Sequence, residues 1–253
     1  MIKKRHTQIL DILSKNNRAD VNTLAELMEV SQVTIRKDLD NLEERGLVCR
    51  EHGYACLNKT DDICKRMSFN YDIKRRIAKA AASMVEEGET IMIESGSCCA
   101  LLAEEIALAQ KDVTIITNSV YITNFIRNAP HTKIILLGGY FQPVSQVVVG
   151  PLTRKYGEIF FSDKFFVGTN GIMPGFGFTG KDHMRSQTVM DLAEYARYIF
   201  VLTDAEKFRN QGVLGMLRFE KVTGVFTDTR IPADCEQLLL DKKVALHKVA
   251  EQE

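Results

Sequence analysis

Residues 22–47 read NTLAELMEVSQVTIRKDLDNLEERGL, which predicts two short helices separated by a tight turn. Leu24 and Leu27 are three residues apart and share one face of the first helix. The helical pattern breaks at residues 29–30, and Ser31 is a favourable N-cap for the second helix. This pattern is typical of a helix-turn-helix.

The second helix has one apolar face and one polar face. Ile35, Leu39 and Leu42 recur at spacings of four and three, which predicts a stripe that faces the core. The outward side chains are mostly hydrogen-bonding or cationic, as base edges and phosphates require. They are Gln32, Val33, Thr34, Arg36, Lys37 and Asn41. We therefore expect this helix to contact DNA.

Two flanking segments complete a winged helix-turn-helix over residues 1–57. Residues 3–15 carry apolar residues on one face and predict a first helix. Residues 46–57 change to a strand-like pattern around a turn at His52 and Gly53, which predicts a two-stranded wing. A unit of this size buries only about 60% of its unfolded surface. We expect it to depend on the rest of the chain or on a second subunit.

The composition is ordinary for a soluble globular protein, with 45% hydrophobic and 26% charged residues among 253. The formal net charge is +0, and over residues 1–59 the basic residues barely outnumber the acidic ones. DNA binding would therefore require charges segregated onto one face. No apolar run approaches the ~20 residues that span a bilayer, and the N-terminus lacks a signal-peptide core. We expect a cytoplasmic protein with no membrane partner.

Six cysteines occur without a C-x-x-C pair or an accompanying histidine cluster. They are Cys49, Cys56, Cys64, Cys98, Cys99 and Cys235. In a cytoplasmic protein this pattern favours free thiols over disulfides or a metal site. We expect neither a metal nor a cofactor.

The texture of the sequence changes after the wing. Residues 58–72 are polar and lack a clear period, which favours a linker over a solvated loop within one domain. From residue 73, helical stretches alternate with apolar strands. The strands are expected at 90–94, 113–117, 133–137, 165–168, 198–203, 222–227 and 243–247. This alternation predicts an α/β domain over residues 73–253, with a mostly parallel sheet covered on both faces.

Small and polar residues follow these strands, and ligands bind beyond the carboxyl ends of strands in open α/β sheets. Glycine and hydroxyl residues before a helix leave backbone amides free to point at an anion. Each such loop is also explained as a tight strand–helix turn, but their convergence suits a small phosphorylated or carboxylated ligand. The candidate ligand-binding residues are Glu94, Ser95, Gly96, Ser97, Cys98, Thr117, Asn118, Ser119, Gly138, Gly139, Asn170 and Lys207.

Two features beside these loops have alternative interpretations. Residues 171–180, GIMPGFGFTG, are either a lid over the site or a plain connecting loop. Cys98 and Cys99 open a helix whose dipole lowers a thiol pKa, so a redox role competes with simple packing.

The chain resembles the DeoR/GlpR-type bacterial transcription regulators over nearly its full length. VSQVTIRKDL at residues 30–39, with Leu42, GL at 46–47 and REHG at 50–53, is similar to the family's helix-turn-helix and wing. The second domain is similar to its sugar-phosphate sensor through Arg66, Asn70, Lys74, Ile77, Ala78, Gly96, Ser97, Thr117, Asn118, Ser119, Leu137, Gly138, Gly139, Gly150, Pro151, Lys207 and Phe208.

The resemblance implies a sensor similar in fold to ribose-phosphate isomerases and CoA transferases. It also implies a repressor of a carbohydrate-use operon, controlled by a phosphorylated sugar bound to the C-terminal domain. The chain departs from the family's usual sequence at three places. ESGSC at residues 94–98 stands where the family often has Asp-x-Gly-Thr-Thr, and Asn170 stands where it often has aspartate. In the wing, Tyr54 stands in place of a glycine. Asn170 also argues against isomerase chemistry, which needs a carboxylate base.

The leading hypothesis is a regulator without catalytic residues that binds double-stranded operator DNA as a homodimer or homotetramer. Arg50 and His52 of the wing would hold the DNA backbone beside the second helix. One alternative is a sugar-phosphate isomerase-like enzyme with an accessory N-terminal module, in which Glu94, Asp182 or Glu206 acts as acid–base. Another is a helix-turn-helix used for protein contacts, which the cationic Arg36 and Lys37 disfavour.

Overall fold

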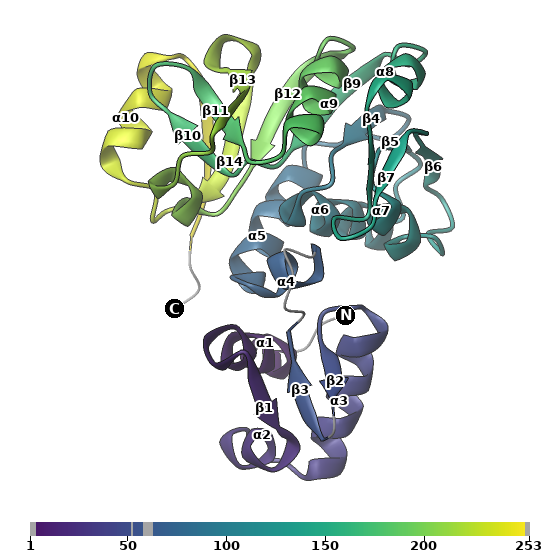
Figure 1. Ribbon diagram of the computed structural model, residues 1–253, viewed down its shortest axis with the longest axis vertical. Coiled ribbons are helices and arrows are strands. Elements are labelled where there is room, and N and C mark those ends of the chain that lie inside the picture. Colours follow the sequence, from purple (N-terminus) through teal and green to yellow (C-terminus); the bar gives the residue numbers. More distant parts are fainter. Residues whose placement is uncertain (1–3, 52, 58–62, 251–253) are drawn as a thin grey trace. The chain divides into compact units, whose positions relative to one another are not determined.

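The computed structural model describes residues 4–51, 53–57 and 63–250. The chain divides into two compact units, Met1–Asp72 and Ile73–Glu253 (Figure 1). Within the described ranges, no helix is both long and apolar enough to cross a membrane.

The first unit is a winged helix-turn-helix, which confirms the predicted class. Its elements are α1 (Lys4–Asn16), β1 (Arg18–Asp20), α2 (Val21–Leu27), α3 (Gln32–Glu44), β2 (Cys49–Glu51) and β3 (Tyr54–Cys56). The Asp20 carboxylate accepts backbone hydrogen bonds at the start of α2, and Ser31 caps α3. The core buries apolar residues of all three helices completely: Ile9, Leu10, Leu13, Leu24, Ile35, Leu39 and Leu42.

Two details of this unit differ from the prediction. The wing is a three-stranded antiparallel sheet in the order β1-β3-β2, because β1 also pairs with β3. The three residues of β1, Arg-Ala-Asp, are too few to show an alternating pattern. Leu27 is 61% exposed, so of the two leucines on α2 only Leu24 reaches the core.

The segment interpreted as a linker contains helical structure in its described part. α4 (Ile63–Ser68) buries Ile63, Cys64, Met67 and Ser68, and the hydroxyl of Ser68 donates to the Leu47 carbonyl at 2.8 Å. α5 (Tyr71–Ala82) begins before residue 73. A six-residue helix carrying Lys65 and Arg66 shows too little periodicity to be recognised from the sequence.

The second unit contains a seven-stranded parallel sheet, in which all seven predicted strands occur. The strands are β4 (Thr90–Ile93), β5 (Thr114–Thr117), β6 (Lys133–Leu136), β9 (Ser162–Val167), β12 (Ala196–Leu202), β14 (Gly224–Asp228) and β15 (Ala245–Val249). Their order is β15-β14-β12-β9-β4-β5-β6, and each neighbouring pair is parallel. All their carboxyl ends therefore lie at one edge of the sheet.

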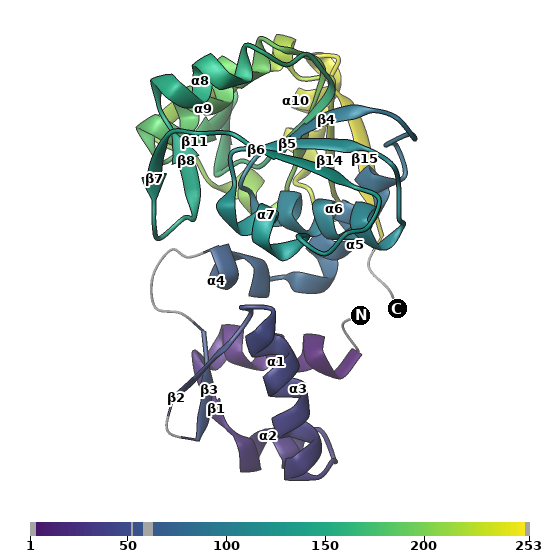
Figure 2. The same ribbon diagram turned by 90° about the vertical axis from the view of Figure 1, so that its right-hand side faces the viewer.

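Helices cover both faces of this sheet (Figure 2). α5, α6 (Ser97–Leu108) and α7 (Val120–Phe125) lie on one side, and α8 (Pro151–Gly157), α9 (His183–Ala193) and α10 (Ala233–Asp241) lie on the other. The main core forms beneath the second group, where Phe165, Val201 and Val225 of the strands pack with Leu192 and Leu239 of the helices. The observed arrangement confirms the predicted α/β class.

Residues 171–180 form a β-hairpin, so the interpretation as a plain connecting loop is wrong. β10 (Gly171–Met173) pairs with β11 (Gly177–Gly180), and β11 pairs with β13 (Leu214–Arg218). Phe178 is fully buried and contacts Phe219 edge-on at 5.7 Å between ring centroids. The strand β11 was not predicted because its glycines are more typical of turns than of strands. Gly177 adopts a φ of 143°, which other residues avoid. A second hairpin, β7 (Tyr140–Gln142) and β8 (Val147–Val149), follows β6.

Candidate nucleic-acid interface and effector site

The turn between α2 and α3 sets the start of the candidate DNA-binding helix. Glu29 has a positive φ of 53°, and the amide of Val30 donates to the Ala25 carbonyl at 3.1 Å. The hydroxyl of Ser31 accepts a bond from the Thr34 amide at 3.2 Å, so α3 begins with a satisfied cap. The break and the cap both lie where the sequence places them.

The outward face of α3 presents most of the predicted DNA-contacting residues to solvent. Gln32, Val33, Arg36, Lys37 and Asn41 are exposed. Thr34 is half-buried, and its hydroxyl lies 2.9 Å from that of Ser31, so it supports the cap more than the surface. Hydrogen-bonding, cationic and apolar groups thus lie together on one helical face, as recognition of base edges requires.

The described part of the wing contributes one of its two predicted residues. Arg50 is exposed on β2, and its guanidinium forms an ion pair with Asp40 on α3. Such an exposed pair is weak, about 0.2–1 kcal/mol, so a phosphate can compete for the guanidinium. His52 lies outside the described residues.

A buried ion pair that the sequence analysis did not single out fixes α3 against α1. The Asp38 carboxylate pairs with Nε of Arg5 and lies 2.9 Å from Nε2 of His6. Burial raises the pKa of Asp38, but the hydrogen bonds from Arg5 and His6 outweigh burial and hold that pKa below its ordinary value. The sequence offered one indication of this pair: Asp38 directly precedes Leu39, a residue of the predicted apolar stripe.

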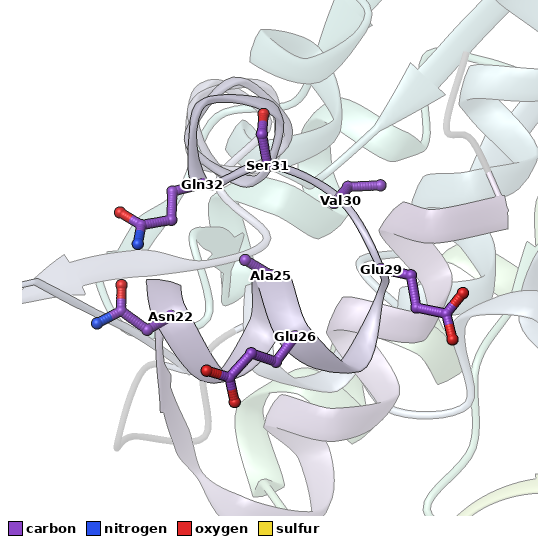
Figure 3. A pocket seen from close by; sticks show the side chains of 7 residues that line it. All are labelled: Asn22, Ala25, Glu26, Glu29, Val30, Ser31 and Gln32. Atoms are coloured by element: carbon purple, nitrogen blue, oxygen red, sulfur yellow. The ribbon is translucent and has the colours of Figure 1, made fainter.

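An open hollow lies between α2 and the start of α3 (Figure 3). The side-chain amides of Asn22 and Gln32 point to the same side of it. Glu26 and Glu29 bring negative charge to its rim, which disfavours a phosphate there. Asn22 is thus a further polar group beside the outward face of α3. The hollow is lined by Asn22, Ala25, Glu26, Glu29, Val30, Ser31 and Gln32.

In the second unit, the predicted ligand residues after β4 and β9 come together. The Glu94 carboxylate accepts from the Ser95 hydroxyl at 2.7 Å and from the Gly168 amide at 3.2 Å. A Cβ placed on Gly96 would lie 3.1 Å from the Cα of Gly168. The two loops therefore touch through their backbones, and Glu94 serves to join them.

The N-terminus of α6 offers backbone amides beside this junction. α6 begins at Ser97 after Gly96, and no side chain among the described residues caps it. Helix N-termini with uncapped amides attract anions. Cys98, in the first turn, is buried, which raises the pKa of its thiol to about 12. The thiol is therefore protonated at neutral pH, and this argues against a reactive thiolate.

Charged side chains gather next to Cys98 at the ends of β12 and β14. Nζ of Lys74 on α5 lies 3.7 Å from Oδ2 of Asp204, and both side chains are almost fully buried. Oδ1 of Asp204 has no hydrogen-bond partner among the described residues. Lys207 is half-buried and, with Lys74, Asp204 and Asp228, acts electrostatically on the Cys98 thiol. The structure thus brings Lys207 and Cys98 into one charged cluster.

Asp228 anchors this cluster to the fold. It is fully buried at the end of β14, and it accepts from the Ala205 amide at 2.8 Å and from Nε of Arg230 at 2.7 Å. Burial raises the pKa of Asp228, but the hydrogen bonds from Arg230 and Ala205 keep it below its ordinary value. Neither Asp228 nor Asp204 was predicted as a site residue, although Asp204 directly follows a predicted strand.

The predicted residues after β5 build the loop themselves. The Thr117 hydroxyl donates to the Ile93 carbonyl at 2.6 Å, and the Ser119 hydroxyl accepts from the Ile122 amide to cap α7. The Asn118 amide group donates to the Val148 carbonyl at 3.0 Å, which leaves its Oδ1 without a partner among the described residues. All three side chains are buried, and Asn118 Oδ1 keeps unused hydrogen-bonding capacity.

The glycines after β6 are required by packing against α8. A Cβ on Gly139 would lie 2.1 Å from the Thr153 hydroxyl, and Gly139 has a φ of 153°. A Cβ on Gly138 would lie 3.1 Å from the Tyr156 ring. The Thr153 hydroxyl also donates to the Gly138 carbonyl at 2.8 Å. These contacts account for glycine at both positions.

Asn170 and Asp182 stabilise the neighbouring hairpin and helix. Oδ1 of Asn170 accepts from the Lys181 amide at 3.2 Å. Asp182 caps α9 by accepting from the Arg185 amide at 2.8 Å. Burial raises the pKa of Asp182, but the bond from the Arg185 amide and further hydrogen bonds lower it below its ordinary value. Asp182 is thus held as a carboxylate, which makes it a weak base.

Comparisons with known proteins identify both units. The family model described as "DeoR-like helix-turn-helix domain" matches residues 5–61, and that described as "DeoR C terminal sensor domain" matches residues 69–229. The chain is 31% identical over 243 residues to "Uncharacterized HTH-type transcriptional regulator FruR" of Bacillus subtilis (strain 168), covering 94% of this chain and 93% of the relative.

A second relative and one solved structure extend the comparison. The chain is 26% identical over 246 residues to the "Glycerol-3-phosphate regulon repressor" of Escherichia coli (strain K12), covering 96% of this chain and 97% of the relative. The structure of "Ribose 5-phosphate isomerase from Plasmodium falciparum" matches with a TM-score of 0.42 and 17% identity, over 56% of this chain and 55% of that one.

Proposed function

This chain belongs to the DeoR family of transcriptional regulators, and we propose that it represses a carbohydrate-use operon under the control of a phosphorylated sugar. The observation that carries the proposal is the outward face of α3, which exposes Gln32, Arg36, Lys37 and Asn41 above a buried apolar stripe. The repressor assignment rests on relatives such as the glycerol-3-phosphate regulon repressor.

In the proposed complex with DNA, α3 enters the major groove. Arg36 and Gln32 reach base edges, each good contact contributing about 1–3 kcal/mol of discrimination. Val33, which is 59% exposed, suits contact with a thymine methyl group. Arg50 exchanges Asp40 for a phosphate, and His52 is a second proposed contact to the DNA backbone.

The proposed effector binds at the carboxyl ends of β4, β5, β9, β12 and β14. The uncapped amides of α6 and the half-buried Lys207 supply positive potential for a phosphate. Oδ1 of Asp204 and Oδ1 of Asn118 are buried acceptors with capacity left, which suits the hydroxyl groups of a sugar. In this arrangement the phosphate and the hydroxyls are recognised by different groups.

We assign the sensor no catalytic step. Glu94 is committed to the Ser95 hydroxyl and the Gly168 amide, and Asp182 caps α9. Neither carboxylate is therefore placed as a free general base, and the amide side chain of Asn170 cannot act as one. Glu206 is exposed on the short helix after β12. These placements favour a binding site over an isomerase.

We propose that successive segments of the chain have different functions. Residues 1–57 bind DNA, residues 73–253 sense the effector, and residues 58–72, which include α4 of the first unit, link the two. Effector binding changes operator affinity through the pairing of subunits, and by linkage operator binding changes effector affinity by the same factor.

We propose that pairing uses the surface of β7 and α8 and that its occupant is a second copy of the chain. Exposed large apolar side chains of the described residues concentrate between residues 136 and 161. The segment before β7 approaches α8, since a Cβ on Gly138 would lie 3.1 Å from the Tyr156 ring. Arg154 of α8 and Glu158 at its C-cap carry opposite charges, which can pair across a two-fold axis. The surface comprises Leu136, Tyr140, Phe141, Leu152, Tyr156 and Ile159.

Sedimentation tests the pairing surface. Tyr156→Glu should give a monomer at concentrations at which the wild type and Val213→Glu remain associated. Val213 is a matched control because it is also exposed but lies on the loop before β13. A monomeric Val213→Glu, or an associated Tyr156→Glu, argues for another interface.

DNA binding is tested with duplexes that the full chain selects from a random-sequence library. Arg36→Ala should weaken binding to a selected duplex by about 1–3 kcal/mol in a gel-shift titration. Glu43→Ala, a change of an exposed acidic residue on the same helix, should leave binding unchanged or tighter. Unchanged affinity of Arg36→Ala removes that residue from the interface. Repression is tested by comparing transcript levels of the operon in a strain that lacks the gene with those in the wild-type strain. The transcripts should increase in the strain that lacks the gene.

Effector binding is tested by thermal unfolding with phosphorylated and unphosphorylated forms of the same sugars. A ligand at 100 times its Kd should stabilise the folded chain by about 2.7 kcal/mol. Lys207→Ala should abolish the response to the phosphorylated form, whereas Lys79→Ala, an exposed lysine of α5, should retain it. Equal responses to both forms of a sugar contradict a phosphate subsite.

A further inference from the structure

The wing places two cysteines directly opposite each other. Cys49 on β2 and Cys56 on β3 are register partners in an antiparallel pair. Opposite residues of such a pair project from the same face of the sheet. Each sulfur lies 3.3 Å from the backbone carbonyl oxygen of the other cysteine, so both thiols reach toward the neighbouring strand. Both side chains are half-buried, and neither forms a disulfide in this structure.

We propose that Cys49 and Cys56 form a redox modification site, at which a peroxide oxidant converts the two thiols into a disulfide that joins β2 to β3. A disulfide requires Cα atoms about 4.4–6.8 Å apart. Opposite residues in antiparallel strands have Cα separations of about 4.5 or 5.5 Å, which lie within that range. Their Cβ atoms, about 4.5–5.5 Å apart in such pairs, must approach to about 3.8 Å. A local adjustment on the order of 1 Å is therefore sufficient.

The reaction balances with hydrogen peroxide as the oxidant. One sulfur, as its thiolate, attacks a peroxide oxygen and breaks the O–O bond, which gives a sulfenic acid and, after proton transfer, one water. The second sulfur attacks the sulfenic sulfur, forms the S–S bond and releases a second water. Two electrons pass from the two sulfurs to the peroxide. A dithiol reductant reverses the change by exchange.

The other four cysteines lack this arrangement. Cys64, Cys98, Cys99 and Cys235 are buried, which limits access of peroxide. Cys98 and Cys99 are adjacent on one helix, and adjacent helical residues do not face each other. Among the described residues, the cysteines of the wing are therefore the pair that combines access with a facing partner.

Closing the disulfide should alter the DNA-binding surface. Successive residues of a strand point to opposite faces, so Arg50, next to Cys49, projects from the other face of the hairpin and pairs with Asp40 of α3. Drawing β2 and β3 together on one face changes the twist that positions Arg50 on the other. We expect weaker DNA binding in the oxidised state. This consequence rests on the proposed DNA-binding function, whereas disulfide formation does not.

Mass spectrometry of the full chain tests the modification. After treatment with hydrogen peroxide and alkylation in denaturant, the wild type should carry two fewer alkyl groups than the reduced protein, and digestion should yield a linked Cys49–Cys56 peptide. Cys49→Ser and Cys56→Ser should form no linked peptide, while Cys235→Ser should form it as the wild type does. Serine retains a donor for the opposite carbonyl, so these variants should fold. All six thiols remaining alkylatable, or links between other cysteines, overturn the proposal.

Gel shifts with a library-selected duplex test the consequence. The oxidised wild type should bind about tenfold more weakly than the reduced protein, as for the loss of one charged contact, and dithiothreitol should restore binding. Peroxide should not change binding by Cys49→Ser. Equal affinities of reduced and linked wild type overturn the effect on the wing. Absence of binding in both states counts against the proposed function, and the linked peptide then still decides the modification.

Discussion

Replacing Asp38 by asparagine should loosen α1 from α3. Asp38 is almost fully buried on α3, and its carboxylate joins Arg5 and His6 of α1. The asparagine side chain would keep one acceptor oxygen but lose the charge that makes both contacts strong. The guanidinium of Arg5 is then left without its anion at the edge of the core.

The size of the effect follows from the burial of each partner. Breaking a fully buried ion pair costs about 3–5 kcal/mol, but the side chain of Arg5 is 25% exposed and can recover some hydration. A hydrogen bond to a charged group contributes about 1.5–3 kcal/mol. We therefore expect Asp38→Asn to reduce the stability of the first unit by about 2–3 kcal/mol.

Hydrogen exchange measures this unit within the full chain. Amides of α1 and α3 in Asp38→Asn should exchange about 30- to 150-fold faster than in the wild type, if they exchange by opening of the unit. Asp40→Asn is the matched control, because Asp40 lies on the same helix and its pair with Arg50 is exposed. It should change exchange by less than about fivefold. Equal acceleration by both substitutions refutes the structural role of Asp38.

The same carboxylate gives a pH dependence of known sign. The pKa of Asp38 is depressed in the folded protein, so its contribution to stability is fully present above the ordinary aspartate pKa of about 3.9. The contribution is lost as the pH falls through the lower folded pKa. After correction for intrinsic rates, acid should accelerate exchange in the wild type more than in Asp38→Asn.

Two substitutions and one labelling experiment test the second unit. Phe178→Ala should destabilise it by about 3–5 kcal/mol in thermal unfolding, because Phe178 is fully buried against Phe219. Gly157→Ala should also destabilise it, since the added Cβ would lie 2.3 Å from Cδ2 of Leu192; overpacking costs about 1–3 kcal/mol and exceeds the helix-propensity gain of about 1 kcal/mol. Cys98, with a pKa of about 12, should resist iodoacetamide at pH 8 until the chain unfolds, which peptide mass mapping can follow.

Local patterns were sufficient to predict the elements that control most of the fold. The stripe of Ile35, Leu39 and Leu42 predicted the buried face of α3, and a capping serine predicted its start. The seven strands of the parallel sheet were recognisable because each is an apolar run between helices. Short elements such as β1, and glycine-rich ones such as β11, were missed because their pairing partners are distant in sequence.

The proposed effector site was only partly predictable, because its charges come from separate segments. Lys207 and Glu94 follow strands and were found by that position, whereas Lys74 approaches from α5 and pairs with Asp204. Gly138 and Gly139 were predicted as ligand contacts, and the structure adds that a Cβ at either position would meet Tyr156 or Thr153 of α8. A sequence shows that a glycine is present, but only the structure shows which atom would meet a Cβ there.

Charge on α3 shows why composition alone could not settle DNA binding. The helix contains Arg36 and Lys37 together with four acidic residues, so its sequence has a net negative charge. In the structure Asp38 is neutralised by Arg5 within the core and Asp40 is paired with Arg50. The two remaining acidic residues lie in the last turn, where they are remote from the Ser31 cap and from the outward residues near it. The N-terminal half of α3 therefore presents a cationic face that the helix dipole strengthens, although the chain as a whole is neutral.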